Sequence, residues 1–187
     1  LQQMLDLGQR PDEGHFFLGR IAEEEGDTER AIELYQKVAD GKDFFAATQR
    51  IALLMLQSGR ADELPGYFAA LRQRHPDRAE RLYGVEANLL EQQGKLEESL
   101  VLLTEGIGSM PDATSLRYSR SIIAERLGDI PLAERDLRAI LSRDPDNATA
   151  LNALGYTLAN RSGRYDEALR LIRRALELQP GAPAILD

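Results

Sequence analysis

The chain has 187 residues, of which 43% are hydrophobic and 29% are charged, so it can bury a core and is not disordered by composition. Its net charge of −8 repels phosphate backbones, which disfavours general nucleic-acid binding. The absence of cysteine excludes disulfides, thiolate nucleophiles and cysteine-ligated zinc, and no uncharged apolar run reaches the ~18 residues of a membrane span.

Glycines and prolines at regular intervals reveal an internal repeat. Five glycines recur at intervals of 33, 35, 34 and 35 residues, namely Gly26, Gly59, Gly94, Gly128 and Gly163. Four prolines follow in step, each 17 residues after one of these glycines, namely Pro76, Pro111, Pro145 and Pro180. Because two residue types keep one period, the chain consists of repeated units.

Each unit is predicted to contain two helices, because apolar residues at three- and four-residue spacing lie on both sides of its glycine. Glycine suits the left-handed residue after the first helix, and proline ends the second. The predicted helices span residues 12–25, 28–40, 44–57, 61–73, 78–92, 95–106, 112–126, 130–142, 147–161 and 165–177. Two irregularities are expected. Gly66 beside Pro65 weakens the start of one helix, and Gly106 with Gly108 ends another early, with a cavity or a bend there.

Small residues stand where the first helices must approach their neighbours, namely Gly19, Ala52, Ala87, Ser121 and Gly155. In the last unit the full pattern is Leu154-Gly155, Leu158, Gly163, Tyr165, Ala168, Ile172, Ala175 and Pro180, and it resembles the tetratricopeptide repeat. The resemblance covers about 12–180. It implies an all-α fold, a right-handed superhelical solenoid of about five helix-turn-helix units, at about 12–43, 44–77, 78–111, 112–145 and 147–180.

The two ends of the sequence also fit this pattern. Residues 1–8 resemble the tail of a preceding second helix, and residues 183–187 the first turn of a further first helix. We therefore expect residues 1–187 to be one solenoid fragment of a longer array, with partial repeats at both ends.

Residues able to carry catalysis or bind a metal are few. His15 and His75 are 60 residues apart and are interpreted as surface or half-buried side chains. Two polar clusters, Glu23-Glu24-Glu25 with Asp27 and Asp144 with Asp146 and Asn147, are interpreted as solvated helix faces and caps. The first is spread around a helix end, and the second lacks the central glycine and distal glutamate of a calcium loop. We predict no catalytic residue, no metal and no cofactor, and hence no enzymatic activity.

The resemblance implies that the first helices form the inner wall of the solenoid, which would be the partner-binding surface. Amides there can hydrogen-bond an extended backbone, and aromatic rings can bury a partner's side chains. The residues predicted to contact a partner are Phe16, Arg20, Gln49, Leu53, Asn88, Glu91, Tyr118, Ile122, Asn152 and Tyr156. The alternative for the aliphatic members is a place in the core between adjacent helices. None of the chain's three lysines falls on this wall, which disfavours the carboxylate clamp of cochaperones.

These observations predict a protein–protein interaction scaffold that binds other proteins or extended peptides. The last unit also resembles large tetratricopeptide lipoproteins of Gram-negative bacteria. That resemblance implies a periplasmic protein, lipid-anchored in the outer membrane, which presents cell-wall hydrolases to a C-terminal processing protease. The alternatives are a regulatory or substrate-selecting arm of a larger enzyme, a solenoid that self-assembles end to end, and a cytoplasmic location.

Overall fold

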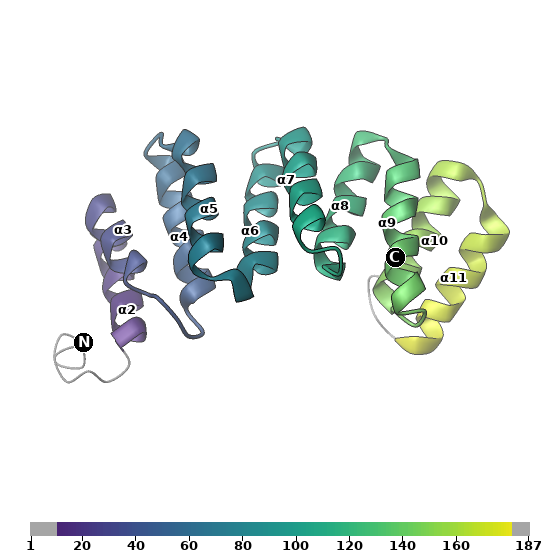
Figure 1. Ribbon diagram of the computed structural model, residues 1–187, viewed down its shortest axis with the longest axis horizontal. Coiled ribbons are helices and arrows are strands. Elements are labelled where there is room, and N and C mark those ends of the chain that lie inside the picture. Colours follow the sequence, from purple (N-terminus) through teal and green to yellow (C-terminus); the bar gives the residue numbers. More distant parts are fainter. Residues whose placement is uncertain (1–10, 181–187) are drawn as a thin grey trace. The chain divides into compact units, whose positions relative to one another are not determined.

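The chain divides into two compact units, Leu1–Ala70 and Leu71–Asp187. The structure, a computed structural model, describes residues 11–180, and every regular element within that range is helical (Figure 1). The predicted helix fragments at 1–8 and 183–187 lie outside the described residues.

The first unit contains the first two helix pairs. Its elements are α2 (Pro11–Glu24), α3 (Thr28–Gln36), α4 (Phe44–Gln57), the 3-10 turn η1 (Ala61–Glu63) and α5 (Leu64–Arg74), the last turn of which belongs to the second unit. Helix α3 packs against both α2 and α4. The α2–α3 contact is close, since a Cβ on Gly19 would lie 2.7 Å from the Tyr35 ring. This confirms the predicted need for a small residue at that position.

The second unit contains three helix pairs after a short 3-10 turn. Its elements are η2 (Pro76–Arg78), α6 (Ala79–Gln92), α7 (Leu96–Ser109), α8 (Thr114–Leu127), α9 (Ile130–Arg143), α10 (Ala148–Ser162) and α11 (Tyr165–Leu178). From α6 to α11 each helix packs against the next along the chain, and α6 also contacts α8 (Figure 1). Fully buried leucines fill the spaces between the helices, including Leu103, Leu137 and Leu154.

The helix ends follow from local chemistry. Gly128 and Gly163 have φ angles of 84° and 65°, the left-handed conformation that glycine adopts without a steric penalty. Asp129 and Asn147 cap α9 and α10 by accepting hydrogen bonds from the backbone N–H groups of residues 132 and 150. The five glycines used to define the repeat all have positive φ, as predicted.

Three helix ends differ from the predicted positions by three or four residues. Helix α3 ends at Gln36 and not near residue 40, and α5 begins at Leu64 after a 3-10 turn. Helix α7 continues through Gly106 and Gly108 to Ser109 instead of ending early. The reason is packing: a Cβ on Gly106 would lie 2.9 Å from Leu116 Cδ1 and 3.1 Å from Tyr83 Cγ, so glycine permits close helix contact here and does not end the helix.

Candidate functional site

The first unit holds four of the predicted contact residues, with Phe16 and Arg20 on α2 and Gln49 and Leu53 on α4. The half-buried Phe16 ring lies 5.6 Å from the Tyr35 ring, centroid to centroid, so it contributes to the packing of α2 on α3. Arg20 pairs with Glu24 on its own helix at 3.5 Å. Gln49 is exposed and Leu53 half-buried. Of these four side chains, Arg20 and Gln49 are the most exposed.

The second unit holds the other six, which we call the first-helix face: Asn88 and Glu91 on α6, Tyr118 and Ile122 on α8, and Asn152 and Tyr156 on α10. Asn88, Ile122 and Tyr156 occupy the same register, at intervals of 34 residues. Tyr118 and Asn152 occupy a second shared register one turn earlier. The face therefore repeats with the period of the array.

The two tyrosines of this face differ in burial. Tyr156 is 56% exposed, which is high for a large apolar side chain. Tyr118 is half-buried, because it packs against the cluster of buried residues that includes Leu154 and Leu158. Ile122 and Asn152 are also half-buried, whereas Asn88 is exposed. Tyr118 and Ile122 are thus partly buried and partly exposed, whereas most of the Tyr156 side chain is accessible to solvent.

Ion pairs join successive first helices at the end of this face. Glu91 of α6 contacts Arg126 of α8. One repeat later, Glu125 of α8 accepts hydrogen bonds from Thr157 Oγ1 and Arg161 Nε of α10, both at 3.4 Å. Glu91, one of the predicted contact residues, thus has its charge paired within the protein. The sequence analysis missed Arg126 and Arg161, although opposite charges at spacings of 35 and 36 residues, close to one repeat, signal such pairs.

The carboxylate groups considered for cation binding have partners within the chain. Glu23 accepts hydrogen bonds from Tyr35 Oη at 2.8 Å and from Arg50, and Asp27 caps α3. Asp146 pairs with Arg174 at 2.8 Å. Across residues 11–180 no group of three or more histidines or carboxylates is placed to hold a metal ion.

A shallow hollow of about 390 Å³ lies in the first unit. It lies where the loop before α4 meets the start of α2 and is lined by Pro11, Asp12, Glu13, Asp40, Gly41, Lys42 and Asp43. Lys42 pairs with Glu13 at 3.5 Å, and Asp12 accepts a hydrogen bond from the Ala39 backbone. The hollow includes none of the predicted contact residues. Among the described helices, none is both long and apolar enough to cross a bilayer.

Sequence profiles described as tetratricopeptide repeat match residues 15–43 and 118–183. The chain is 45% identical over 176 residues to TPR repeat-containing protein PA4667 of Pseudomonas aeruginosa, covering 94% of this chain and 30% of that protein. The chain therefore spans less than a third of that curated relative.

Two solved structures share the fold. The tetratricopeptide protein YrrB, whose structure is described as having an unusual peptide-binding site, aligns with a TM-score of 0.58 at 17% identity, over 99% of this chain and 95% of that one. The first tetratricopeptide domain of Spaghetti (RPAP3), bound to the HSP90 peptide SRMEEVD, aligns with a TM-score of 0.53 at 22% identity, over 57% of this chain and 84% of that one. These likenesses confirm the predicted fold class, an all-α tetratricopeptide solenoid.

Proposed function

This chain is a tetratricopeptide-repeat protein, and from that premise we propose that it is a non-catalytic adaptor whose first-helix face holds an extended segment of another protein. Proteins of this fold bind other proteins or peptides, as the HSP90 peptide on the RPAP3 domain illustrates. Since that likeness concerns the fold, the ligand of this chain must be inferred from its own residues.

The observation that carries the proposal is the exposed ring of Tyr156 beside uncharged side chains. A tyrosine that is 56% exposed provides a large apolar contact with few rotatable bonds, which is why tyrosines dominate binding energies at interfaces. Asn88 lies at the same register two repeats earlier; its Oδ1 accepts a hydrogen bond from Gln92 Nε2 at 2.8 Å, and its amide N–H groups can bond to a backbone. An aromatic anchor and an amide along successive helices suit an extended chain.

The charges of the face indicate the kind of segment. Glu91 with Arg126, and Glu125 with Arg161, neutralise one another at its end. The centre of the face consists of Asn88, Tyr118, Ile122, Asn152 and Tyr156, which are all uncharged. A segment with apolar and neutral polar side chains would bind there without losing the hydration of its own charges. We therefore infer a neutral stretch of the partner as the ligand.

We extend this proposal to the cell envelope. The last unit resembles the large tetratricopeptide lipoproteins of Gram-negative bacteria, and the similar protein PA4667 comes from a bacterium of that group. On this proposal the whole protein is held at the periplasmic side of the outer membrane by a lipid. It binds a C-terminal processing protease and presents cell-wall hydrolases to it.

A comparative pull-down tests both the first-helix face as the binding site and the protease-adaptor role. The wild-type chain and a Tyr118→Ala/Tyr156→Ala variant are immobilised and exposed to envelope extract, and the retained proteins are identified by mass spectrometry. Losing two aromatic anchors should cost about 2 kcal/mol or more, which is roughly a thirtyfold loss of affinity. We expect a processing protease or a hydrolase on the wild type and not on the variant.

Two further variants serve as controls. Tyr165→Ala removes a tyrosine that is 70% exposed on α11, outside the first-helix face, and should retain every partner. Tyr156→Ala alone avoids the core contacts of Tyr118 and should weaken retention without lowering the melting temperature. Equal retention by all variants would refute the first-helix face as the site, and retention of other proteins alone would refute the protease-adaptor role.

A further inference from the structure

Two charged side chains are buried at the same register of successive first helices in the second unit. Glu86 of α6 is 5% exposed and Arg120 of α8 is 9% exposed. Each stands eight residues before the glycine of its repeat, Gly94 or Gly128. In the last repeat, whose loop is one residue longer, the same register is Leu154, which is fully buried. The repeats of this unit thus carry an acid, a base and a leucine at one structural position.

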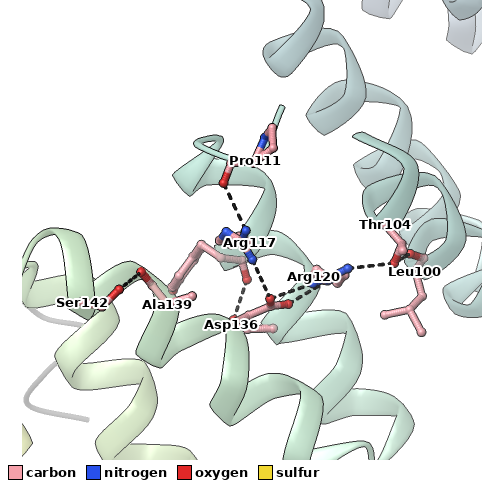
Figure 2. Close-up of polar contacts among 10 residues, drawn as sticks. Leu100, Thr104, Pro111, Arg117, Arg120, Asp136, Ala139 and Ser142 are labelled. Carbon is pink, nitrogen blue, oxygen red and sulfur yellow. Dashed lines mark hydrogen bonds and ion pairs between the residues drawn. The ribbon is translucent and has the colours of Figure 1, made fainter. Parts of the chain in front are cut away.

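Arg120 pairs with Asp136 of α9, which is fully buried (Figure 2). Arg120 Nε donates to Asp136 Oδ2 at 2.7 Å and Nη2 to Oδ1 at 2.8 Å, a bidentate geometry. Arg120 Nη1 also donates to Thr104 Oγ1 of α7 at 3.1 Å. Arg117 approaches the same carboxylate at 3.4 Å and donates to the Pro111 carbonyl at 3.1 Å (Figure 2). Arg120 of α8 therefore joins its own helix to both α7 and α9.

Glu86 pairs with a residue of the preceding helix, whereas Arg120 pairs with a residue of the following one. Its partner is Arg72 in the last turn of α5, whose guanidinium carbon lies 4.1 Å from the centroid of the Tyr83 ring. Tyr83 in turn donates to Glu105 of α7 at 3.0 Å. Burial raises the pKa of Glu86, and the hydrogen bond from Arg72 opposes that rise only in part. Glu86 pairs with the helix before its own repeat, whereas Arg120 pairs with the second helix of its own repeat.

Helix exchange between repeats would break these pairs. The register of Asp136, eight residues after the repeat glycine, is Leu102 in α7 and Leu171 in α11. If α8 of one copy docked on α7 or α11 of another, Arg120 would face leucine. If α9 docked on α6 or α10, Asp136 would face Glu86 or Leu154. Each arrangement buries an unpaired charge or brings two carboxylates together, and both are strongly unfavourable.

We propose that the Arg120–Asp136 and Arg72–Glu86 pairs act as register keys, which stop repeats with the same apolar pattern from exchanging helices between copies of the chain during folding. A buried ion pair adds little net stability over a well-packed apolar pair, because desolvation offsets the attraction. Its advantage is selectivity, since only one arrangement of the helices satisfies it. The other repeats carry apolar residues at this register, namely Leu18, Ile51 and Leu154.

A co-refolding experiment tests whether the Arg120–Asp136 pair prevents helix exchange between copies. The variant Arg120→Leu/Asp136→Leu copies the leucines of α10–α11 into α8–α9. Since the chain has no cysteine, Val101→Cys, at a position that is 69% exposed, provides a single labelling site in every variant. Donor-labelled and acceptor-labelled copies are unfolded together in urea, refolded by dilution at two protein concentrations, and analysed by size-exclusion chromatography and energy transfer.

The wild type should refold as a monomer with no transfer between copies. The double variant should keep its helical circular dichroism and a melting temperature close to that of the wild type. It should nevertheless give a several-fold larger share of dimers with transfer, which rises with concentration. The control Glu91→Gln/Arg126→Gln removes an exposed ion pair of the same helix α8 and should refold like the wild type.

Two results would overturn the proposal. A double variant that refolds as cleanly as the wild type would show that leucines specify the register equally well. A double variant that has lost its helical signal would show that the pair maintains the fold itself and does not select the register.

Discussion

Two successive repeats of the second unit, α8–α9 and α10–α11, share their plan and differ in what they bury. Both join their helices through a left-handed glycine. The α8–α9 repeat places the bidentate pair Arg120–Asp136 between its helices, whereas α10–α11 places Leu154 and Leu171 there. One backbone thus accepts either an ion pair or two leucines at one register. The two repeats should therefore differ in how much stability a single substitution removes, because a buried charge depends on its partner far more than a buried leucine does.

The largest loss of stability is expected from Asp136→Leu, which gives α9 the leucine that α11 carries at the same register, Leu171. Arg120 keeps Thr104 but loses its carboxylate, so a buried guanidinium is left unpaired. Breaking one partner of such a pair costs about 3–5 kcal/mol. Urea unfolding followed by circular dichroism should show this loss, and adding Arg120→Leu should recover most of it. If Asp136→Leu alone were as stable as the wild type, the α8–α9 repeat would not depend on its buried ion pair.

A smaller effect is expected where the repeats differ in close packing. In α10 a Cβ on Gly155 would lie 2.6 Å from Ile172 Cγ1 and 3.1 Å from the Ala168 carbonyl oxygen, whereas α8 accommodates the buried Ser121 at the same position. Gly155→Ala should therefore destabilise by about 1–3 kcal/mol through overpacking.

The matched control for that substitution lies in a helix with open space. A Cβ on Gly84 of α6 would meet no atom within 4 Å, so Gly84→Ala should stabilise by about 0.5–1 kcal/mol through helix propensity. Thermal melts of both variants should show a lower melting temperature for Gly155→Ala and a higher one for Gly84→Ala. If Gly155→Ala raised the melting temperature as Gly84→Ala is expected to, the α10–α11 contact would not be tight.

The sequence was sufficient for the features that depend on local backbone chemistry. The five repeat glycines predicted left-handed turns, and the small residues at Gly19 and Gly155 predicted close helix contacts. It misjudged Gly106, because the same residue ends helices and permits close approach, and only the neighbours Tyr83 and Leu116 distinguish the two roles.

The buried pairs escaped the sequence analysis for a different reason. An arginine in an amphipathic helix ordinarily marks the solvent side, so Arg120 was not assigned to the core. Counting eight residues from the repeat glycine would have shown that Arg120 and Asp136 both occupy apolar registers with opposite charges. The identity of the partner segment stays a prediction, since the residues of the first-helix face constrain its chemistry but not its sequence.

The smallest effect concerns the surface contact that joins the two repeats. Glu134 of α9 is partly buried, which disfavours its charge, but hydrogen bonds from Arg138 and from Arg164 of the next repeat outweigh this and lower its pKa. An acid whose pKa is lower in the folded state stabilises the fold above its unfolded value of about 4.5 and loses that contribution as the pH falls through the folded value.

Glu134→Gln should therefore cost about 0.5 kcal/mol near pH 7, as expected for a pair close to the surface, and nothing once the pH lies well below the lowered pKa of Glu134. Melting temperatures of both proteins across this range should converge on acidification. Glu33→Gln, which alters an exposed carboxylate on α3, should follow the wild type throughout. A gap that widened towards low pH would mean that the carboxylate of Glu134 opposes the contact between the repeats, and the cohesion of α8–α9 with α10–α11 would then rest on their apolar contacts alone.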